Sequence, residues 1–178
     1  MGEAERAEPA KLIVGGISGD RVAWGLAREL LLERYGPLEF EAGPIAFDMT
    51  AYYEGEMGKG LFRWLVSFEQ SVGQSEIAGI KHETNRLEAG IAAKRNWPVS
   101  RPVNLDPGYV TLGKLVLATT KDQAHRIAVG EDIYAEVTLR FTGGRFEPNP
   151  WTYADYRQES YLEFFAKVRE SLRAELRA

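Results

Sequence analysis

The sequence predicts an α+β fold, with a mixed or antiparallel sheet and helices packed mainly on one face. Short apolar runs of strand length alternate with stretches in which apolar residues recur at helical spacing. These elements follow one another as strand, helix, strand, strand, helix, strand, which is the ferredoxin-like βαββαβ order. An antiparallel hairpin and a carboxy-terminal helix are predicted to extend this core.

The first strand and helix are the clearest elements of the amino-terminal half. Residues 1–10 are polar, and we predict a disordered tail. The apolar run Lys11–Ile17 has the length of a buried strand. A helix opens at Gly19-Asp20 and is stopped by Gly36-Pro37. Residues 38–47 are predicted to be extended.

The middle of the chain contains a polar loop, a strand, a helix and a second irregular stretch. Residues 48–60 are polar, aromatic and rich in glycine, so we predict a loop. Leu61–Glu69 alternates between apolar and polar residues, as a strand does. A helix follows, with its apolar stripe between Ile77 and Ile91. Residues 96–113 contain three prolines, and Asp106-Pro107-Gly108 within them is a turn signal.

The carboxy-terminal part is predicted to contain three strands and a helix. Leu115–Thr119 is the sixth element of the core. Arg126–Val129 and Ile133–Phe141 form a hairpin about the loop Gly130-Glu131-Asp132. The last helix begins near Asp155. The 178 residues are of the size of one domain, so we predict a single domain over residues 1–178.

The composition excludes several classes of protein. There is no cysteine, so disulfides, thiolate catalysis and thiolate metal sites are excluded. No apolar run approaches the roughly 18 residues of a membrane span, and we expect a cytoplasmic protein without membrane contacts. The net charge of −4 argues against nucleic acid as a partner, since proteins that bind polyanions are usually basic. Homo-oligomer formation is left open.

One pair of charged residues is predicted to meet across the hairpin. Pairing about a three-residue loop places Arg126 opposite Glu136 on one face, together with Tyr134 and Thr138. Two interpretations are open: an ordinary half-exposed ion pair, or the floor of a ligand cleft with Glu136 as acid, base or metal ligand. Tyr134 and Thr138 are then candidate ligand contacts. The other face is entirely apolar: Ile133, Ala135, Val137, Leu139 and Phe141.

The connection Thr119–Arg126 is a second candidate site. It combines hydroxyls, two cations and a histidine, which suit a phosphate or carboxylate. We take Lys121 and Arg126 as ligand-binding residues, with Lys114 from the preceding strand, and His125 as a candidate catalytic residue. The alternative is a solvated turn.

Asn104 and Asp106 form a third candidate site. Two residues apart in an extended segment, they point the same way and suit Mg²⁺ or a substrate hydroxyl. Asp106 is a candidate catalytic residue, and together with Glu136 a candidate metal ligand; alternatively it caps the turn that it opens. The segment from residue 48 to 56 is acidic and aromatic, with Asp48, Tyr52, Tyr53, Glu54 and Glu56. Two interpretations are open: a mobile acidic loop, or a further source of oxygen ligands for a metal ion.

Several longer segments are recognisable together. They include Phe47–Glu54 (FDMTAYYE), Arg101–Tyr109 (RPVNLDPGY), Lys114–Asp122 (KLVLATTKD), Ile133–Leu139 (IYAEVTL) and Pro150–Arg157 (PWTYADYR). On these segments the chain resembles a bacterial family catalogued as domain of unknown function 4416. The resemblance implies a stand-alone bacterial protein of this size and carries no established activity.

Three functions are compatible with these observations. The first is a small-molecule binding protein or enzyme that acts on a phosphorylated or nucleotide-like ligand, with or without Mg²⁺. The second is a non-catalytic scaffold module that presents an aromatic patch of Trp151, Tyr153 and Tyr156. The third is RNA binding through aromatic residues on the sheet. The residues leave open whether the protein is an enzyme.

Overall fold

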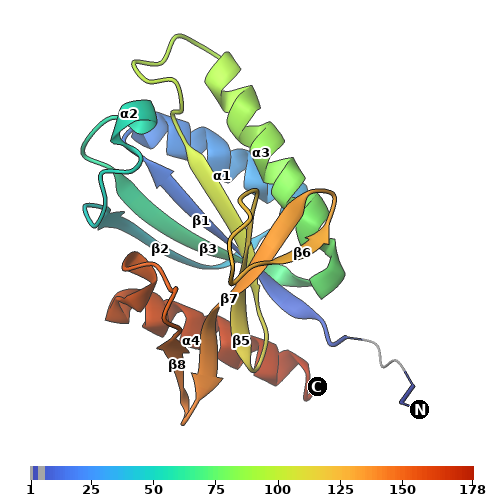
Figure 1. The fold of residues 1–178 in the computed structure, drawn as a ribbon. Helices are drawn as coiled ribbons and strands as arrows, with labels where there is room; N and C mark the ends of the chain where they lie inside the picture. Colours follow the sequence, from blue (N-terminus) through green and yellow to red (C-terminus); the bar gives the residue numbers. More distant parts are fainter. Residues whose placement is uncertain (1, 4–6) are drawn as a thin grey trace.

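A computed structural model describes residues 2–3 and 7–178 and confirms the α+β class (Figure 1). The strands are β1 (Ala10–Ser18), β2 (Leu38–Ala46), β3 (Phe62–Val72), β4 (Asn104–Val110), β5 (Lys114–Thr119), β6 (Ile127–Gly130), β7 (Ile133–Thr142) and β8 (Arg145–Pro148). The helices are α1 (Arg21–Tyr35), α2 (Glu54–Met57), α3 (Ile77–Ala93) and α4 (Glu159–Glu175), with 3₁₀ turns at Gln74–Glu76 and Asp155–Arg157. Residues 1 and 4–6 of the predicted tail lie outside the described residues, and Ala10 is already buried in β1.

The strands form one antiparallel sheet in the order β2-β3-β1-β4-β5-β7-β6, and β8 pairs with β7. α1 connects β1 to β2, and α3 connects β3 to β4. The predicted succession of strand, helix, strand, strand, helix, strand is therefore present. The predicted loop at residues 48–60 contains the short helix α2.

The prediction of a turn at Asp106-Pro107-Gly108 is wrong, because β4 runs through these residues and pairs with β1 along its whole length. β4 is therefore the fourth strand of the core, and the predicted strand Leu115–Thr119 is part of the fifth. Proline usually avoids central strands because it has no N–H to donate. Here β4 pairs with β5 only over Gly108–Val110, so Pro107 has no strand beside it on that side.

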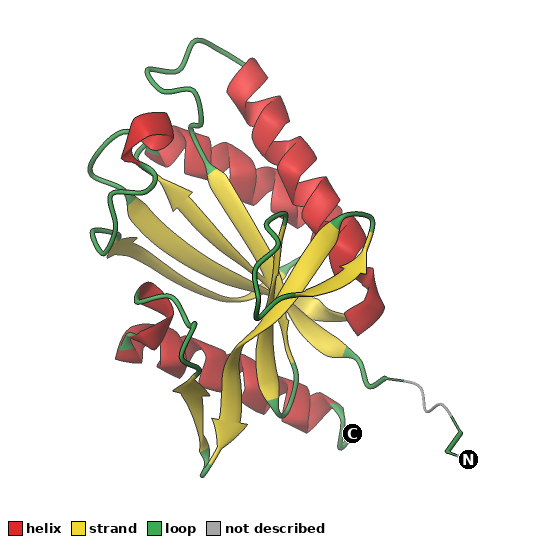
Figure 2. Cartoon of the chain, in the orientation of Figure 1, coloured by secondary structure: helices red, strands yellow, loops and turns green. Residues whose placement is uncertain are grey.

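Helices cover both faces of the sheet (Figure 2). α1 and α3 pack on one face, where Leu12 and Val14 of β1 meet Trp24 and Leu31 of α1. α4 packs on the opposite face, where Ile13 meets Phe165. The alternation of β1 explains this arrangement, since successive side chains of a strand point to opposite faces. Two of the three long helices thus share a face, and α4 closes the other.

The hairpin of β6 and β7 has the predicted register at Ile127 and Ala128, but the predicted three-residue loop is wrong: Gly130 belongs to β6 and lies opposite Ile133, so the loop is Glu131-Asp132, and the pairing is irregular between Ala128 and Gly130. Ile127 lies opposite Ala135, which extends to Arg126 opposite Glu136. The predicted apolar face of β7 is interrupted, however: Val137 is exposed, whereas Glu136 and Thr138 are buried. The pairing with β5 is irregular between Val137 and Leu139, so Leu139 packs in the cluster on the α4 face, whereas Ile133 and Ala135 pack in the cluster that includes Ile77 of α3.

Candidate functional site

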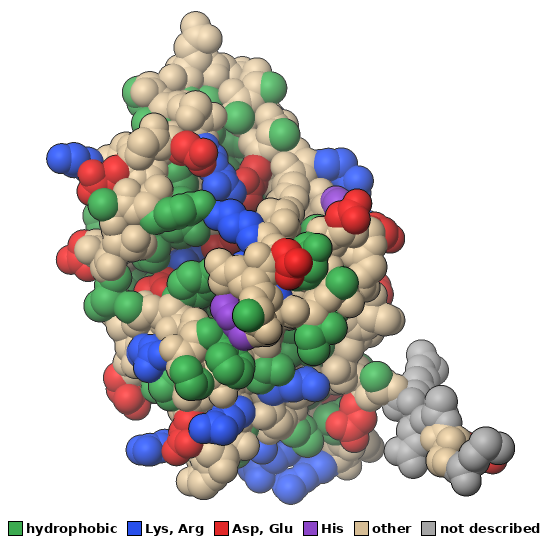
Figure 3. Space-filling view, in the orientation of Figure 1, with side chains coloured by type: hydrophobic (Ala, Val, Ile, Leu, Met, Phe, Trp, Pro, Cys, Tyr) green, Lys and Arg blue, Asp and Glu red, His purple; other side chains and the backbone are tan. Residues whose placement is uncertain are grey.

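A pocket of about 630 Å³ opens where β4 and β5 diverge. Beyond Gly108 the two strands no longer pair, so the first half of β4 and the end of β5 lie apart. The pocket lies between them and is lined by the 47–53 segment, β3, α3, β4, the end of β5 with the loop that follows, β7 and residues 153–156. In Figure 3, basic and acidic side chains gather between the α2 segment and α3.

Side chains of α3 take the place of the missing strand beside β4. The Glu88 carboxylate accepts a hydrogen bond from the Leu105 N–H at 2.6 Å, and the Lys81 ammonium donates to the Leu105 carbonyl at 2.9 Å. The Arg101 guanidinium lies 2.9 Å from the Glu88 carboxylate and also donates to Asn104. Burial raises the pKa of the Glu88 carboxyl, and Arg101 and Lys81 offset only part of this effect. The edge of β4 is therefore fully hydrogen-bonded at Leu105.

The floor of the pocket is built around Arg63 of β3. Its guanidinium is buried and donates to Asp155 at 2.8 Å and to Asp106 at 3.3 Å. It also lies 5.1 Å from the centre of the Phe47 ring and 5.5 Å from that of Tyr156. Burial alone would lower the pKa of Arg63, but the neighbouring acidic groups outweigh burial and raise it. Arg63 therefore remains a cation.

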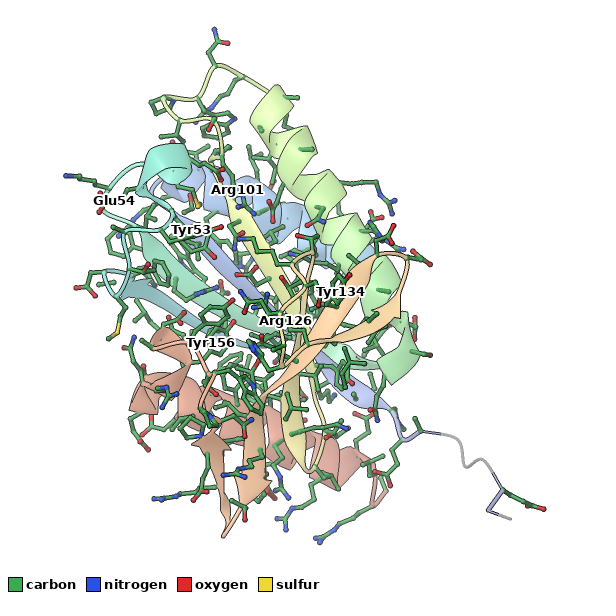
Figure 4. The ribbon with its side chains drawn as sticks, in the orientation of Figure 1. Tyr53, Glu54, Arg101, Arg126, Tyr134 and Tyr156 are labelled. Atoms are coloured by element: carbon green, nitrogen blue, oxygen red, sulfur yellow. The ribbon has the colours of Figure 1, made fainter. Side chains whose placement is uncertain are left out.

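Gly15 of β1 makes room for this floor. A Cβ atom at this position would lie 2.9 Å from the Arg63 guanidinium and 3.0 Å from the Tyr156 hydroxyl. Since both groups come this close to one point, they converge above the glycine. Figure 4 labels Tyr156, Arg126 and Arg101, which come from different segments of the chain and all line the pocket.

The predicted ion pair between Arg126 and Glu136 is present and buried. The Arg126 Nε donates to a Glu136 carboxylate oxygen at 2.8 Å, and His125 Nε2 lies 3.0 Å from the same oxygen. The Thr138 hydroxyl donates to the other oxygen at 3.2 Å. The remaining Arg126 donors bind the Lys121 carbonyl at 3.0 Å and the Tyr153 hydroxyl at 2.7 Å. Arg126 thus holds the loop that carries Lys121.

Lys121 lies at the mouth of the pocket and is bound differently. Its ammonium donates to the Tyr52 hydroxyl and lies 4.4 Å from the centre of the Tyr52 ring, a cation–π contact. Tyr52 is 65% exposed. Within the described part of the chain, no acidic side chain lies in salt-bridge range of Lys121.

Of the predicted site residues, five line the pocket: Asn104, Asp106, Lys121, Arg126 and Glu136. His125 and Thr138 bind Glu136 without lining the pocket. Lys114 and Tyr134 do not line it either; Lys114 lies at the opposite end of β5, beside Arg140. The structure also brings in charged residues that the sequence predictions missed: Arg63, Lys81, Glu88 and Asp155.

The predicted magnesium ligands Asp106 and Glu136 are both already bound to cations. Asp106 accepts from Arg63 and lies 3.8 Å from the Lys81 ammonium, while Glu136 accepts from Arg126. In residues 2–3 and 7–178 no three histidine or acidic side chains are grouped so as to hold a metal ion. These contacts favour an organic ligand over a magnesium centre.

Asp106 is expected to make the stability of the protein depend on pH. Burial alone would raise the pKa of its carboxyl, but Lys81, Arg63 and the Asn104 amide together lower it. A carboxyl with a lowered folded-state pKa stabilises the fold above its unfolded-state pKa of about 3.9, and this contribution is lost as the pH falls through the lowered value.

Asp106→Asn is therefore expected to lower the free energy of unfolding by roughly 2 kcal/mol near pH 7. The difference from wild type should shrink as the pH falls below about 4. Urea unfolding at several pH values measures it. Asp48→Asn, at an exposed carboxylate, is the control. A deficit that stays constant down to pH 2.5 would show that the charge of Asp106 is not responsible.

Fold and site together define an α+β protein with a charged pocket at a split in its antiparallel sheet. Residues 8–172 match the family described as Domain of unknown function (DUF4416), and the chain belongs to this family. No curated protein and no solved structure matches the chain. Since no solved structure matches, the ferredoxin-like topology stays a prediction, and the strand order supports it. None of the helices in the described ranges is long and apolar enough to cross a membrane.

Proposed function

We propose that the protein binds a small phosphorylated or nucleotide-like compound in the pocket between β4 and β5. The observation that carries this proposal is the convergence of charged, hydroxyl and aromatic side chains from segments far apart in the sequence on one cavity. Its volume of about 630 Å³ is within the range of small-molecule sites, roughly 300–1,000 Å³. Cations with hydroxyls recognise phosphate, and aromatic rings at the rim suit a flat or ring-shaped group.

Binding is better supported than catalysis. The two carboxylates predicted as acid or base, Asp106 and Glu136, are each hydrogen-bonded to an arginine. A carboxylate held in this way is a weak proton acceptor, because the neighbouring cation stabilises its charged form. These residues are better suited to shape the pocket and orient its other side chains.

The two alternative functions have less support. The scaffold interpretation needs Trp151, Tyr153 and Tyr156 on the surface, but Tyr156 is buried with 1% of its area exposed. The RNA interpretation needs an open sheet face on which bases stack. α1 and α3 cover one face, and α4 covers the other.

A thermal-shift screen against nucleotides and sugar phosphates tests the proposal. A compound at about 100 times its Kd adds roughly 2.7 kcal/mol to the free energy of unfolding, which shifts Tm by several degrees in a domain of this size. The thermal shift caused by a binding compound should be lost in Thr120→Trp, which places an indole at the pocket. It should be retained in Thr142→Trp, at an exposed position outside the pocket. A screen without hits contradicts the proposal; a hit that survives Thr120→Trp places the ligand elsewhere.

A further inference from the structure

The charges that line the pocket are matched except at one point. Five cations and four acids line it. The cations are Arg63, Lys81, Arg101, Lys121 and Arg126, and the acids are Glu88, Asp106, Asp155 and Glu136. Every cation except Lys121 lies within 4 Å of one of these acids. The surplus positive charge is therefore located at the mouth.

The arginines inside the pocket have little left to offer an anion. Arg126 uses its three nitrogen atoms on Glu136, the Lys121 carbonyl and Tyr153. Arg101 binds Glu88 and Asn104. A phosphate placed among these pairs would add negative charge beside carboxylates in a poorly solvated region, which is unfavourable. The interior is therefore unsuited to the charged end of a ligand.

The interior does offer hydrogen-bonding groups. The Tyr156 hydroxyl and the Arg63 Nε are buried and have no hydrogen-bond partner among the described residues. Buried polar groups normally have a partner, so an acceptor atom that reached these two groups would complete their hydrogen bonding. The side chains of Asn85 and Asp106 line the same pocket and supply amide and carboxylate groups. Such groups recognise sugar hydroxyls or the polar edge of a heterocycle.

The mouth has the opposite character. Lys121 is exposed, and among the described residues its ammonium is bound only by Tyr52. Thr119 and Thr120 line the pocket beside it. A phosphate can replace the Tyr52 hydroxyl on the ammonium, and it adds an attraction between opposite charges that the uncharged hydroxyl lacks. One surplus cation is sufficient for one phosphate group and leaves the further charges of a polyphosphate unmatched.

From this distribution of charge we infer that the ligand is a phosphomonoester of an uncharged polar group, with its phosphate on Lys121 at the mouth and its polar group directed towards Tyr156 and Arg63. The inference rests on the proposed function and specifies its ligand class. It excludes the nucleoside triphosphates as preferred ligands. Tyr52 is displaced from the ammonium when the phosphate binds.

The test compares probes that differ only in phosphate: ribose with ribose 5-phosphate, adenosine with AMP and ATP, and guanosine with GMP and GTP. Affinities are measured by calorimetry for wild type, Lys121→Met, Lys121→Arg and the control Lys114→Met, which removes a lysine outside the pocket. In wild type the best monophosphate should bind at least about tenfold more tightly than its unphosphorylated partner and than its triphosphate. Lys121→Met should abolish the advantage of the phosphate and leave the affinity for the unphosphorylated probe unchanged.

The remaining outcomes separate this inference from the proposed function. Lys121→Arg should keep most of the advantage of the phosphate, and Lys114→Met all of it. If monophosphates bind but Lys121→Met keeps their advantage, or if triphosphates bind more tightly than monophosphates, the inference is wrong and the proposed function stands. If no compound of either kind binds to the wild-type protein, both are wrong.

Discussion

Arg63→Met is expected to lower the free energy of unfolding by about 3–5 kcal/mol, the range found when one partner of a buried ion pair is removed. The substitution leaves Asp155 and Asp106 without their shared arginine, and Asp155 is itself buried. Because a domain is stable by only about 5–15 kcal/mol, the effect should be visible as a large fall in the urea midpoint.

Arg28→Met is the matched control for Arg63→Met. Arg28 is bound to Glu41 by two hydrogen-bonding nitrogens, but on the surface, so its loss should change the free energy of unfolding by less than about 1 kcal/mol. Equal effects of the two substitutions would mean that the charges around Arg63 are well solvated, and the description of the floor as a buried ion-pair cluster would be wrong.

Glu136→Ala is expected to have an effect of similar size, about 3–5 kcal/mol, because it leaves the buried Arg126 guanidinium without its carboxylate. The double variant Arg126→Met, Glu136→Leu removes both charges and fills the space with apolar side chains. It should be less destabilised than the sum of the two single variants Arg126→Met and Glu136→Leu.

Chemical unfolding of the wild type and these variants gives the coupling energy between Arg126 and Glu136. A coupling energy near zero would place this pair with ordinary surface ion pairs, the interpretation that the sequence had left open. The His125→Ala variant adds a useful comparison, because His125 binds the same carboxylate and does not line the pocket. Its effect should be smaller than that of Arg126→Met.

The pairing of Arg126 with Glu136 was predicted by counting from an assumed three-residue loop, Gly130-Glu131-Asp132. The loop has only the two residues Glu131-Asp132, and the irregularity between Ala128 and Gly130 restores the register that was counted. The register shift in β7 was not predictable in the same way, because it arises from pairing with β5 and not from β7 itself. The pairing within the hairpin could be derived from the sequence, whereas the irregularity between β7 and β5 could not.

The path of β4 shows why a strong local signal can mislead. Asp106-Pro107-Gly108 is a typical turn sequence, yet here α3 supplies Lys81 and Glu88 to the backbone of Leu105, so the chain stays extended. Arg63 was missed for a related reason. It alternates with apolar residues just as the exposed Glu69 does, and only the folded chain places it between Asp106 and Asp155.

The short contact between β4 and β5 divides the sheet into two leaves. In the described chain, the leaf containing β1–β4 pairs with the leaf containing β5–β8 only through Gly108–Val110 of β4, and the seam between the leaves is open at the pocket. The pocket is lined by Asp106 on one leaf and by Glu136 on the other, so a molecule that fills it would bridge the two leaves. A bound ligand should keep the seam from widening. We therefore expect slower amide hydrogen exchange along β5 and β7 when the ligand is bound, including at positions far from the ligand.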